Sequence, residues 1–206
     1  MPNDREFEEF VLFYNNEFLP AYSDMVGFIV YKPEEVLISL EHSFSHILQY
    51  FTPGIAEELK RENLLKAKHH IQRATLDCYK IFWHAMDVYL VKLVDDHNKR
   101  KFCINMTEGD FLRAFFDFKT KAQEARRIEA RNVGINLLET IEAYKTACSY
   151  GKIIYNNIDT VKMADFDKLR TKIWAFISAR EYIAGVLTAV IAGLIILAID
   201  CFFFRK

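Results

Sequence analysis

Apolar residues recur every three or four positions along most of the chain, which is the spacing of amphipathic α-helices. The pattern predicts helices over about 4–18, 33–51, 55–96 and 134–158, one that begins at Thr107, and a last one from near Asp165. They are separated by Pro20, by "TPG" at 52–54, by "DDHNKRKFCIN" and by "NNIDT". The sequence therefore predicts an all-α fold.

Each predicted helix carries an apolar face that we expect to be buried. In the second helix this face comprises Leu37, Leu40, Phe44, Ile47 and Phe51. In the long helix a seam of small and aliphatic residues keeps a three-four rhythm. It consists of Leu64, Ala67, Ile71, Ala74, Cys78, Ile81, Ala85 and Val88.

The C-terminal segment differs because it is apolar all the way round. Between Tyr182 and Phe204 only Asp200 is charged, and residues 182–199 form an uncharged run. At about 1.5 Å per residue, such a run spans roughly 27 Å, close to the hydrocarbon thickness of a bilayer. We therefore expect a single transmembrane helix that acts as a tail anchor; the alternative is a buried or docked helix.

These features divide the chain into three parts: a cytosolic helical bundle over 1–165, a juxtamembrane helix over 166–181 and a transmembrane helix over 182–204. Basic residues precede the span at Lys168, Arg170, Lys172 and Arg180, whereas only Arg205 and Lys206 follow it. This bias favours an N-terminal domain on the cytoplasmic side, which would be the inner membrane in a bacterium.

Small residues recur within the span at Gly185, Ala189 and Gly193. Such a face lets helix backbones approach closely in lipid, so it predicts a homo-oligomer; chance is the alternative, because Gly and Ala are common in transmembrane helices. Asp200 either reaches the interface and pairs with Arg205 or lines a polar pathway through an oligomer.

The composition supports a helical cytosolic domain. Phe (18) and Tyr (10) are abundant, while Gly (7) and Pro (4) are scarce, which disfavours disorder and turn-rich β folds. The net charge of −1 does not indicate a strongly basic nucleic-acid surface. The four cysteines are scattered without CxxC spacing, and the acidic start "MPNDREFEEF" does not resemble a signal peptide, so we expect free thiols.

One polar stripe runs along the long helix beside its apolar seam. Its candidate site residues are His70, Arg73, Asp77, Lys80 and His84, which follow one another at helical spacing. The stripe is either a solvated flank of the helix, a surface that binds a partner or an anionic ligand, or, as a third alternative, a catalytic site.

Other constellations are less specific. His42 and His46 have metal-ligand spacing, but "HSFSH" lacks the glutamate of a zincin helix, so we interpret them as solvated. The basic run from Lys119 to Arg131 is interleaved with acids and is typical of an exposed helix face. No phosphate-loop, dinucleotide or nucleophile-elbow motif is present, and we expect neither a metal nor a cofactor.

The stretch "HHIQRATLDCYK" on a long helix, together with the C-terminal span, resembles membrane-anchored HEPN-like accessory and effector proteins of CRISPR and other phage-defence systems. Nuclease members carry an arginine followed four to six residues later by a histidine. Here seven residues separate Arg61 from His69 and ten separate Arg73 from His84, so that motif is absent. The resemblance implies an effector that self-assembles and compromises the membrane.

Three functional hypotheses follow. The first is a self-assembling, membrane-disrupting or pore-forming effector of antiviral defence, whose partners are the bilayer, other copies of the chain and a protein or RNA complex on the cytosolic side. The second is a membrane-tethered HEPN-like protein that binds or cleaves RNA. The third is a non-enzymatic membrane adaptor.

Overall fold

The computed structural model describes residues 4–132 and 135–203, with the side chains of residues 4, 178–179 and 195–203 left out of the description. The described chain is helical apart from short connections, which confirms the all-α prediction. Its elements are α1 (Asp4–Phe13), η1 (Tyr14–Phe18), α2 (Leu19–Ile29), α3 (Glu34–Tyr50), α4 (Glu57–Asp95), α5 (His97–Cys103), α6 (Glu108–Arg131), α7 (Leu137–Tyr155) and α8 (Thr160–Phe203).

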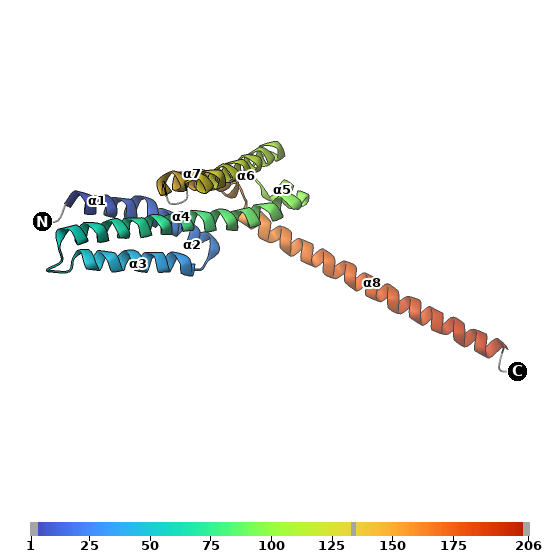
Figure 1. Cartoon of the computed structure of the whole chain (residues 1–206). Helices are drawn as coiled ribbons and strands as arrows, with labels where there is room; N and C mark the ends of the chain where they lie inside the picture. The colour runs from blue at the N-terminus through green and yellow to red at the C-terminus, as the bar shows by residue number, and fades with distance from the viewer. Residues whose placement is uncertain (1–3, 133–134, 204–206) are drawn as a thin grey trace.

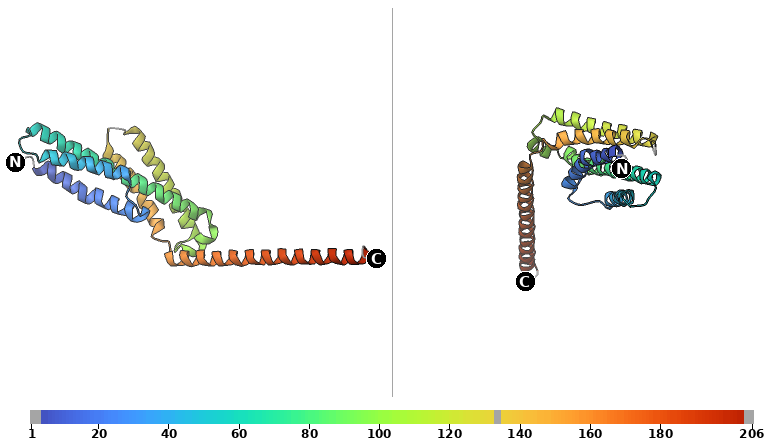
Figure 2. Two further views of the ribbon diagram at one scale, coloured as in Figure 1. Left: turned by 90° about the horizontal axis from the view of Figure 1, so that it is seen from below. Right: turned by 90° about the vertical axis from the view of Figure 1, so that its left-hand side faces the viewer.

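The long helix α4 is the spine of the bundle. Figure 1 shows α3 below it, α1, α6 and α7 above it, and α8 pointing away from all of them. The most extensive helix contacts are those of α3 with α4, α6 with α7, and α4 with α7. Both views in Figure 2 show that α8 stands apart from the bundle along almost its whole length.

The first helical run passes through Pro20, so the prediction that it stops there is wrong. A π-helical turn, η1, precedes the proline, and the Leu19 amide donates to the Tyr14 carbonyl. Proline lacks an amide hydrogen and its ring clashes with the carbonyl four residues earlier. The wider turn relieves this conflict, and the run continues to Val30, where a left-handed residue (φ 64°) ends it.

The face of α3 that packs on α4 is not the apolar stripe that the sequence suggests. Val36, Ser39, Ser43 and Tyr50 are buried, whereas Phe44 is 60% exposed. Ser43 Oγ donates to the Ala67 carbonyl at 2.9 Å, so a small polar residue lies at the closest approach of the two helices. Four residues of the predicted stripe, Leu37, Leu40, Phe44 and Ile47, instead line an apolar groove between α1 and α3, to which Ile71 of α4 also contributes.

The predicted seam of α4 is correct only in its first part. Its members from Leu64 to Cys78 are buried, but Ile81 and Ala85 are half-buried and Val88 is exposed. The reason is that α6 and α7 cover the second half of α4 from a different direction. The buried residues there are Phe82, Trp83, Met86, Leu90 and Leu93.

A short helix, α5, occupies the segment that the sequence predicts to be only a break. Asp96 caps it, since its side chain accepts a hydrogen bond from the Lys99 amide. The predicted cap of α6 is confirmed: Thr107 Oγ1 accepts from the Asp110 amide at 3.1 Å. An antiparallel bridge between Ile104 and Ile158 then brings the start of α8 next to the end of α5.

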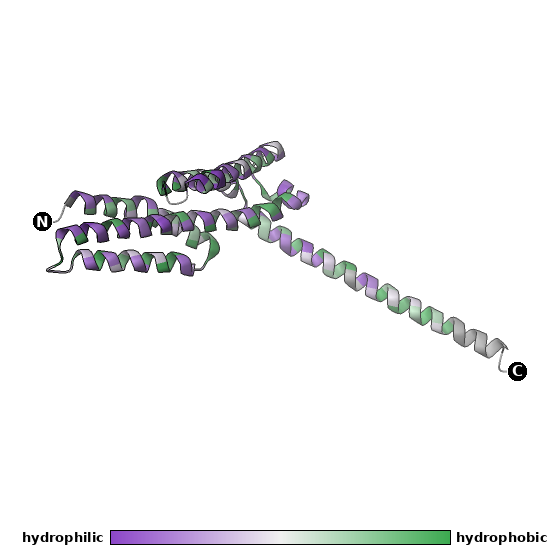
Figure 3. Cartoon of the chain, viewed as in Figure 1, coloured by the Kyte–Doolittle hydropathy of each residue, from purple (hydrophilic) through white to green (hydrophobic). Residues whose placement is uncertain are grey.

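Within the described residues, α8 contacts the rest of the chain through its first turns, mainly at α5 and the residues that flank it. Lys99 donates to both carboxylate oxygens of Asp167 at 2.9 Å, and Arg170 donates to Asp96 at 3.1 Å. Among the described residues, α8 is the one helix long and apolar enough to cross a membrane, and none of its apolar window is buried in the chain. Figure 3 shows polar residues concentrated near the bundle and apolar residues farther along α8.

Candidate functional site

The polar stripe of α4 divides into two parts with different surroundings. His70 and Arg73 face a surface groove, while Lys80 reaches across to α6. His84 is exposed, and its ring lies 6.3 Å from that of Trp83. The stripe is therefore neither uniformly solvated nor a single site.

The second part of the stripe holds α4 against α6 and α7. Lys80 donates to Glu129 Oε1 at 2.8 Å, and the Tyr144 hydroxyl donates to Glu129 Oε2 at 2.7 Å. Partial burial alone would raise the pKa of Glu129, but the two hydrogen bonds bring it below its ordinary value. Two turns farther along α4, Lys119 of α6 donates to Asp87 at 2.7 Å. These bonds tie three helices together and serve the fold.

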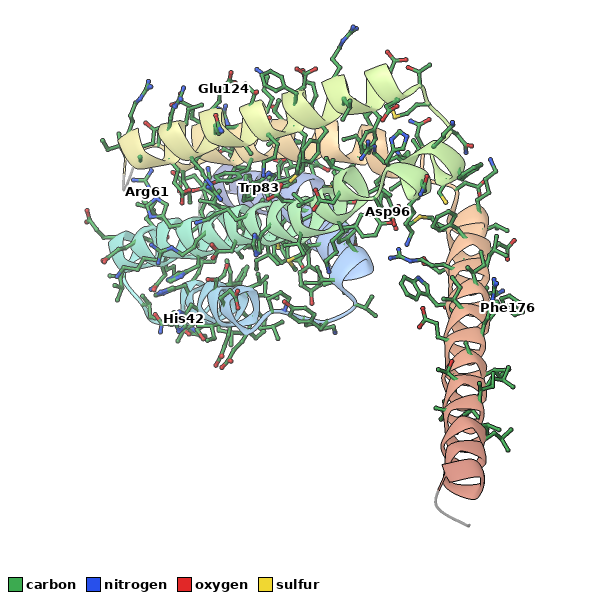
Figure 4. All side chains as sticks on the ribbon, turned by 90° about the vertical axis from the view of Figure 1, so that its right-hand side faces the viewer. His42, Arg61, Trp83, Asp96, Glu124 and Phe176 are labelled. Atoms are coloured by element: carbon green, nitrogen blue, oxygen red, sulfur yellow. The ribbon has the colours of Figure 1, made fainter. Side chains whose placement is uncertain are left out.

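The same layer contains a cation–π contact. The Arg126 guanidinium lies 4.6 Å from the centre of the Trp83 ring, between α6 and α4. Figure 4 shows Trp83 beneath α6, whereas Glu124 of that helix points outward. Within the described chain the buried Trp83 Nε1 has no hydrogen-bond partner, so its ring is held by packing and by the cation.

Asp77 lies between the two parts and is only half-buried. Desolvation raises the pKa of its carboxyl, although Lys80 and Arg73 act in the opposite direction. The structure shows no hydrogen bond or ion pair for this carboxylate among the described residues. Its ionised form is therefore incompletely compensated.

The first part of the stripe joins a cluster of histidines. The ring of His70 lies 5.2 Å from that of His42 and 5.5 Å from that of His46, both on α3. His46 Nδ1 is 2.9 Å from Asn63 Oδ1, and the Asn63 amide nitrogen donates to the Leu59 carbonyl. The Asn63 oxygen can only accept a hydrogen bond, so His46 Nδ1 must be the nitrogen that carries the proton. In the neutral ring, His46 Nε2 is then free to accept another hydrogen bond.

The spacing of His42 and His46 predicts a shared metal or solvated rings, and we favour the solvated interpretation from the sequence. In the structure His42 is exposed, in agreement with that interpretation, and His46 is half-buried. Both rings also contact the half-buried His70, His46 stacked on it and His42 edge-on. Burial is the main reason that the pKa of His70 is lowered, and His42, His46, Arg73 and His69 add to the effect. No group of three or more His, Cys, Asp or Glu residues in the described chain is arranged to hold a metal.

A groove of about 440 Å³ lies between α4 and the connection from α6 to α7. Its lining comprises His69, His70, Gln72, Arg73, Ile135, Asn136, Leu137 and Leu138. Gln72 is only 6% exposed, and its amide has no hydrogen-bond partner within the described chain. Because Gln72 lines the groove, a ligand or water in the groove can supply the missing hydrogen-bond partner of its amide.

The predicted packing residues of the membrane helix lie on its free surface. Gly185, Ala189 and Gly193 are exposed, and a methyl group added at either glycine would meet no other atom within 4 Å. Within the part of the chain that the structure describes, no side chain covers this face. The side chain of Asp200 lies outside the described residues, so its predicted roles stay predictions.

Sequence reasoning alone missed the contributions of Gln72 and of the turn at 135–138. Gln72 does not stand out in the sequence, because it lies between the apolar seam and the polar stripe of α4. It becomes part of a groove only because residues 135–138 lie beside it in the structure. The spacing of His42 and His46 could be recognised in the sequence, but the register of α3 against α4 was needed to connect them to His70.

No protein-family model matches this chain, and neither a curated protein nor a solved structure matches it.

Proposed function

We propose that this protein is a membrane-anchored effector that assembles through α8 and thereby disturbs the bilayer. The observation that carries the proposal is the free apolar surface of α8. A helix that buries its apolar residues in its own fold shows one apolar stripe, whereas every described side chain from 180 to 194 is exposed. Such a surface requires lipid or another protein.

Assembly follows from the kind of surface that α8 offers. Lipid tails are as apolar as leucine, so helices associate in a bilayer through close packing, which small residues permit. Gly185 and Gly193 lie free on this helix. The bundle is proposed to lie on the cytoplasmic side, since the basic residues concentrate between it and the span. A role in antiviral defence is supported by the resemblance of the sequence to HEPN-like effectors.

The first test is membrane association. The full chain should remain in the pellet after carbonate extraction of cell membranes, whereas a chain that ends at Ser178 should be soluble and helical by circular dichroism. Recovery of the full chain in the soluble fraction would contradict the anchor.

The second test is bilayer damage. The full chain, reconstituted into liposomes, should release an encapsulated dye, and the Ser178 truncation should not. Intact liposomes combined with cleavage of total RNA that depends on Arg73 and on His70 or His84 would contradict the proposal and favour a tethered ribonuclease. Intact liposomes without RNA cleavage would favour an adaptor.

A further inference from the structure

The groove beside Arg73 collects groups that can carry positive charge. Arg73, His69 and His70 line it, and His42 and His46 stand directly behind His70. No carboxylate is among the lining residues that the structure describes. Arg73 is exposed and has neither a hydrogen bond nor an ion pair within the described chain, although it lies close enough to Asp77 to influence it.

Two other carboxylates of this region are engaged elsewhere. Glu62, about two turns before His70, pairs with Lys66 at 2.6 Å. Glu139 of α7 accepts from the amides of Asn132 and Asn136. Asp77, one turn after Arg73, influences Arg73 electrostatically but forms no ion pair with it and does not line the groove. Within the described residues, the lining of the groove therefore supplies no carboxylate that neutralises Arg73.

A buried donor completes the groove. Gln72 is more than nine-tenths buried, lines the groove and has no hydrogen-bond partner in the described chain. Its amide can donate to an oxygen of a ligand and accept from a second polar group. This side chain is an independent indication that the groove receives a polar ligand.

The opposite wall is apolar. Ile135, on the α6–α7 connection, is 82% exposed, and Leu138, in the first turn of α7, is 47% exposed. An aromatic ring laid against them would remove apolar surface from water. The volume of about 440 Å³ is within the range that holds small organic ligands.

We propose that this groove binds a soluble phosphate-bearing ligand of nucleotide size, with the phosphate on Arg73, His70 and Gln72 and the ring on Ile135 and Leu138. A bidentate guanidinium and a neighbouring imidazolium match the geometry and charge of phosphate oxygens. The site goes beyond the membrane activity proposed above and does not depend on it.

The position of the groove separates a soluble ligand from a lipid headgroup. His70 precedes the end of α4 by 25 residues, a distance of about 38 Å along the helix. Figure 1 shows that this half of α4 points away from the tip of α8. A headgroup at the base of the anchor therefore lies far from the groove.

Binding should depend on pH. Desolvation and the surrounding cationic groups lower the pKa of His70, so its ring is neutral in the free protein at neutral pH. A phosphate beside it favours the protonated ring. Affinity should therefore rise as the pH falls from 8 to 6. The titratable and charged groups that act on His70 are His42 and His46 from α3 and His69 and Arg73 from α4.

The experiment is calorimetric titration of the full chain, in nanodiscs of phosphatidylcholine, with ADP and with inorganic pyrophosphate. We expect saturable binding of both, with ADP the tighter because only ADP carries a ring. Arg73→Gln should weaken both by about 10- to 100-fold, as expected for the loss of a charge-assisted hydrogen bond. Arg127→Gln, an exposed arginine of α6, is the matched control and should change nothing.

Further arms keep the assignment falsifiable. His70→Gln should remove the increase in affinity between pH 8 and pH 6 beyond that of the ligand's own titration. Ligand should also slow amide hydrogen exchange at residues 135–138. Absence of binding, or equal losses in Arg73→Gln and Arg127→Gln, would overturn the site. If nanodiscs that contain phosphatidylserine compete with ADP, a headgroup is the ligand and the soluble assignment is wrong.

Discussion

Gly151 of α7 allows the closest packing contact that the structure shows at a glycine. A Cβ built there would lie 2.7 Å from Met86 Sδ and 2.9 Å from Phe118 Cε2. Both neighbours are fully buried, so neither can move into solvent. Gly151→Ala must therefore overpack the junction of α4, α6 and α7, at a cost of about 1–3 kcal/mol.

Helix propensity acts in the opposite direction and must be separated from the clash. Alanine is favoured over glycine in a helix interior by about 1 kcal/mol. Gly27→Ala in α2 supplies the matched control, because a methyl group there meets nothing within 4 Å. Gly27→Ala should stabilise the bundle by about 0.4–1 kcal/mol, so the difference between the two variants isolates the clash at about 1–3 kcal/mol.

The assay is urea unfolding of the full chain in detergent micelles, followed by tryptophan fluorescence. The chain has two tryptophans, and Trp174→Phe leaves buried Trp83 as the reporter of the bundle. Met86→Ala should partly relieve the clash, so the double variant should lose less than the sum of the single losses. Equal stabilities of Gly151→Ala and Gly27→Ala would refute the packing of α7 against α4 and α6.

Three further predictions concern the stripe and the membrane helix. Arg73→Ala should change the free energy of unfolding by no more than about 0.5 kcal/mol, since the side chain is exposed, and a loss of several kcal/mol in the same urea assay would reveal a structural role. Asp77→Asn should stabilise the bundle at pH 7, because the pKa of Asp77 is raised in the folded state and its ionisation therefore destabilises the fold. The gain in the free energy of unfolding, measured in urea, should vanish as the pH falls through that pKa toward 3. An undiminished gain at pH 3 would contradict this origin. Gly185→Leu with Gly193→Leu should preserve membrane insertion but abolish crosslinking between copies, with Leu187→Ala as the control; unchanged crosslinking would assign assembly to the bundle.

The sequence predicts the helices well because their apolar period is strong, and Thr107 shows that a cap can be recognised from local chemistry alone. It fails where neighbours decide which face is buried. In α3 the close contact uses Ser39 and Ser43, since small side chains allow α3 to approach α4, and the larger apolar residues are displaced to the groove. No local sequence pattern shows whether the serine face or the larger apolar face of α3 packs against α4.

The candidate site shows the same limit. Arg73 and His70 are found by helical spacing, which is a local property, whereas the groove exists because the α6–α7 connection lies beside them. Lys80 has the same spacing, but it donates to Glu129 of α6 and so stabilises the packing of α4 against α6. Separating a ligand-facing residue from a structural one along a single polar stripe therefore requires the positions of partners far away in sequence.

The junction between bundle and anchor depends on few contacts: one antiparallel bridge, the stacked rings of Phe102 and Phe166, and ion pairs. Asp96 ends α4, caps α5 and accepts from Arg170, while Lys99 holds Asp167. Exposed ion pairs contribute about 0–1 kcal/mol each, whereas the free energy of unfolding of a domain is about 5–15 kcal/mol. The angle between bundle and α8 is thus fixed far less firmly than either part is folded. Contacts between copies need to supply only a few kcal/mol to reorient the bundles over the membrane, and they can do so without unfolding the groove or the core around Trp83.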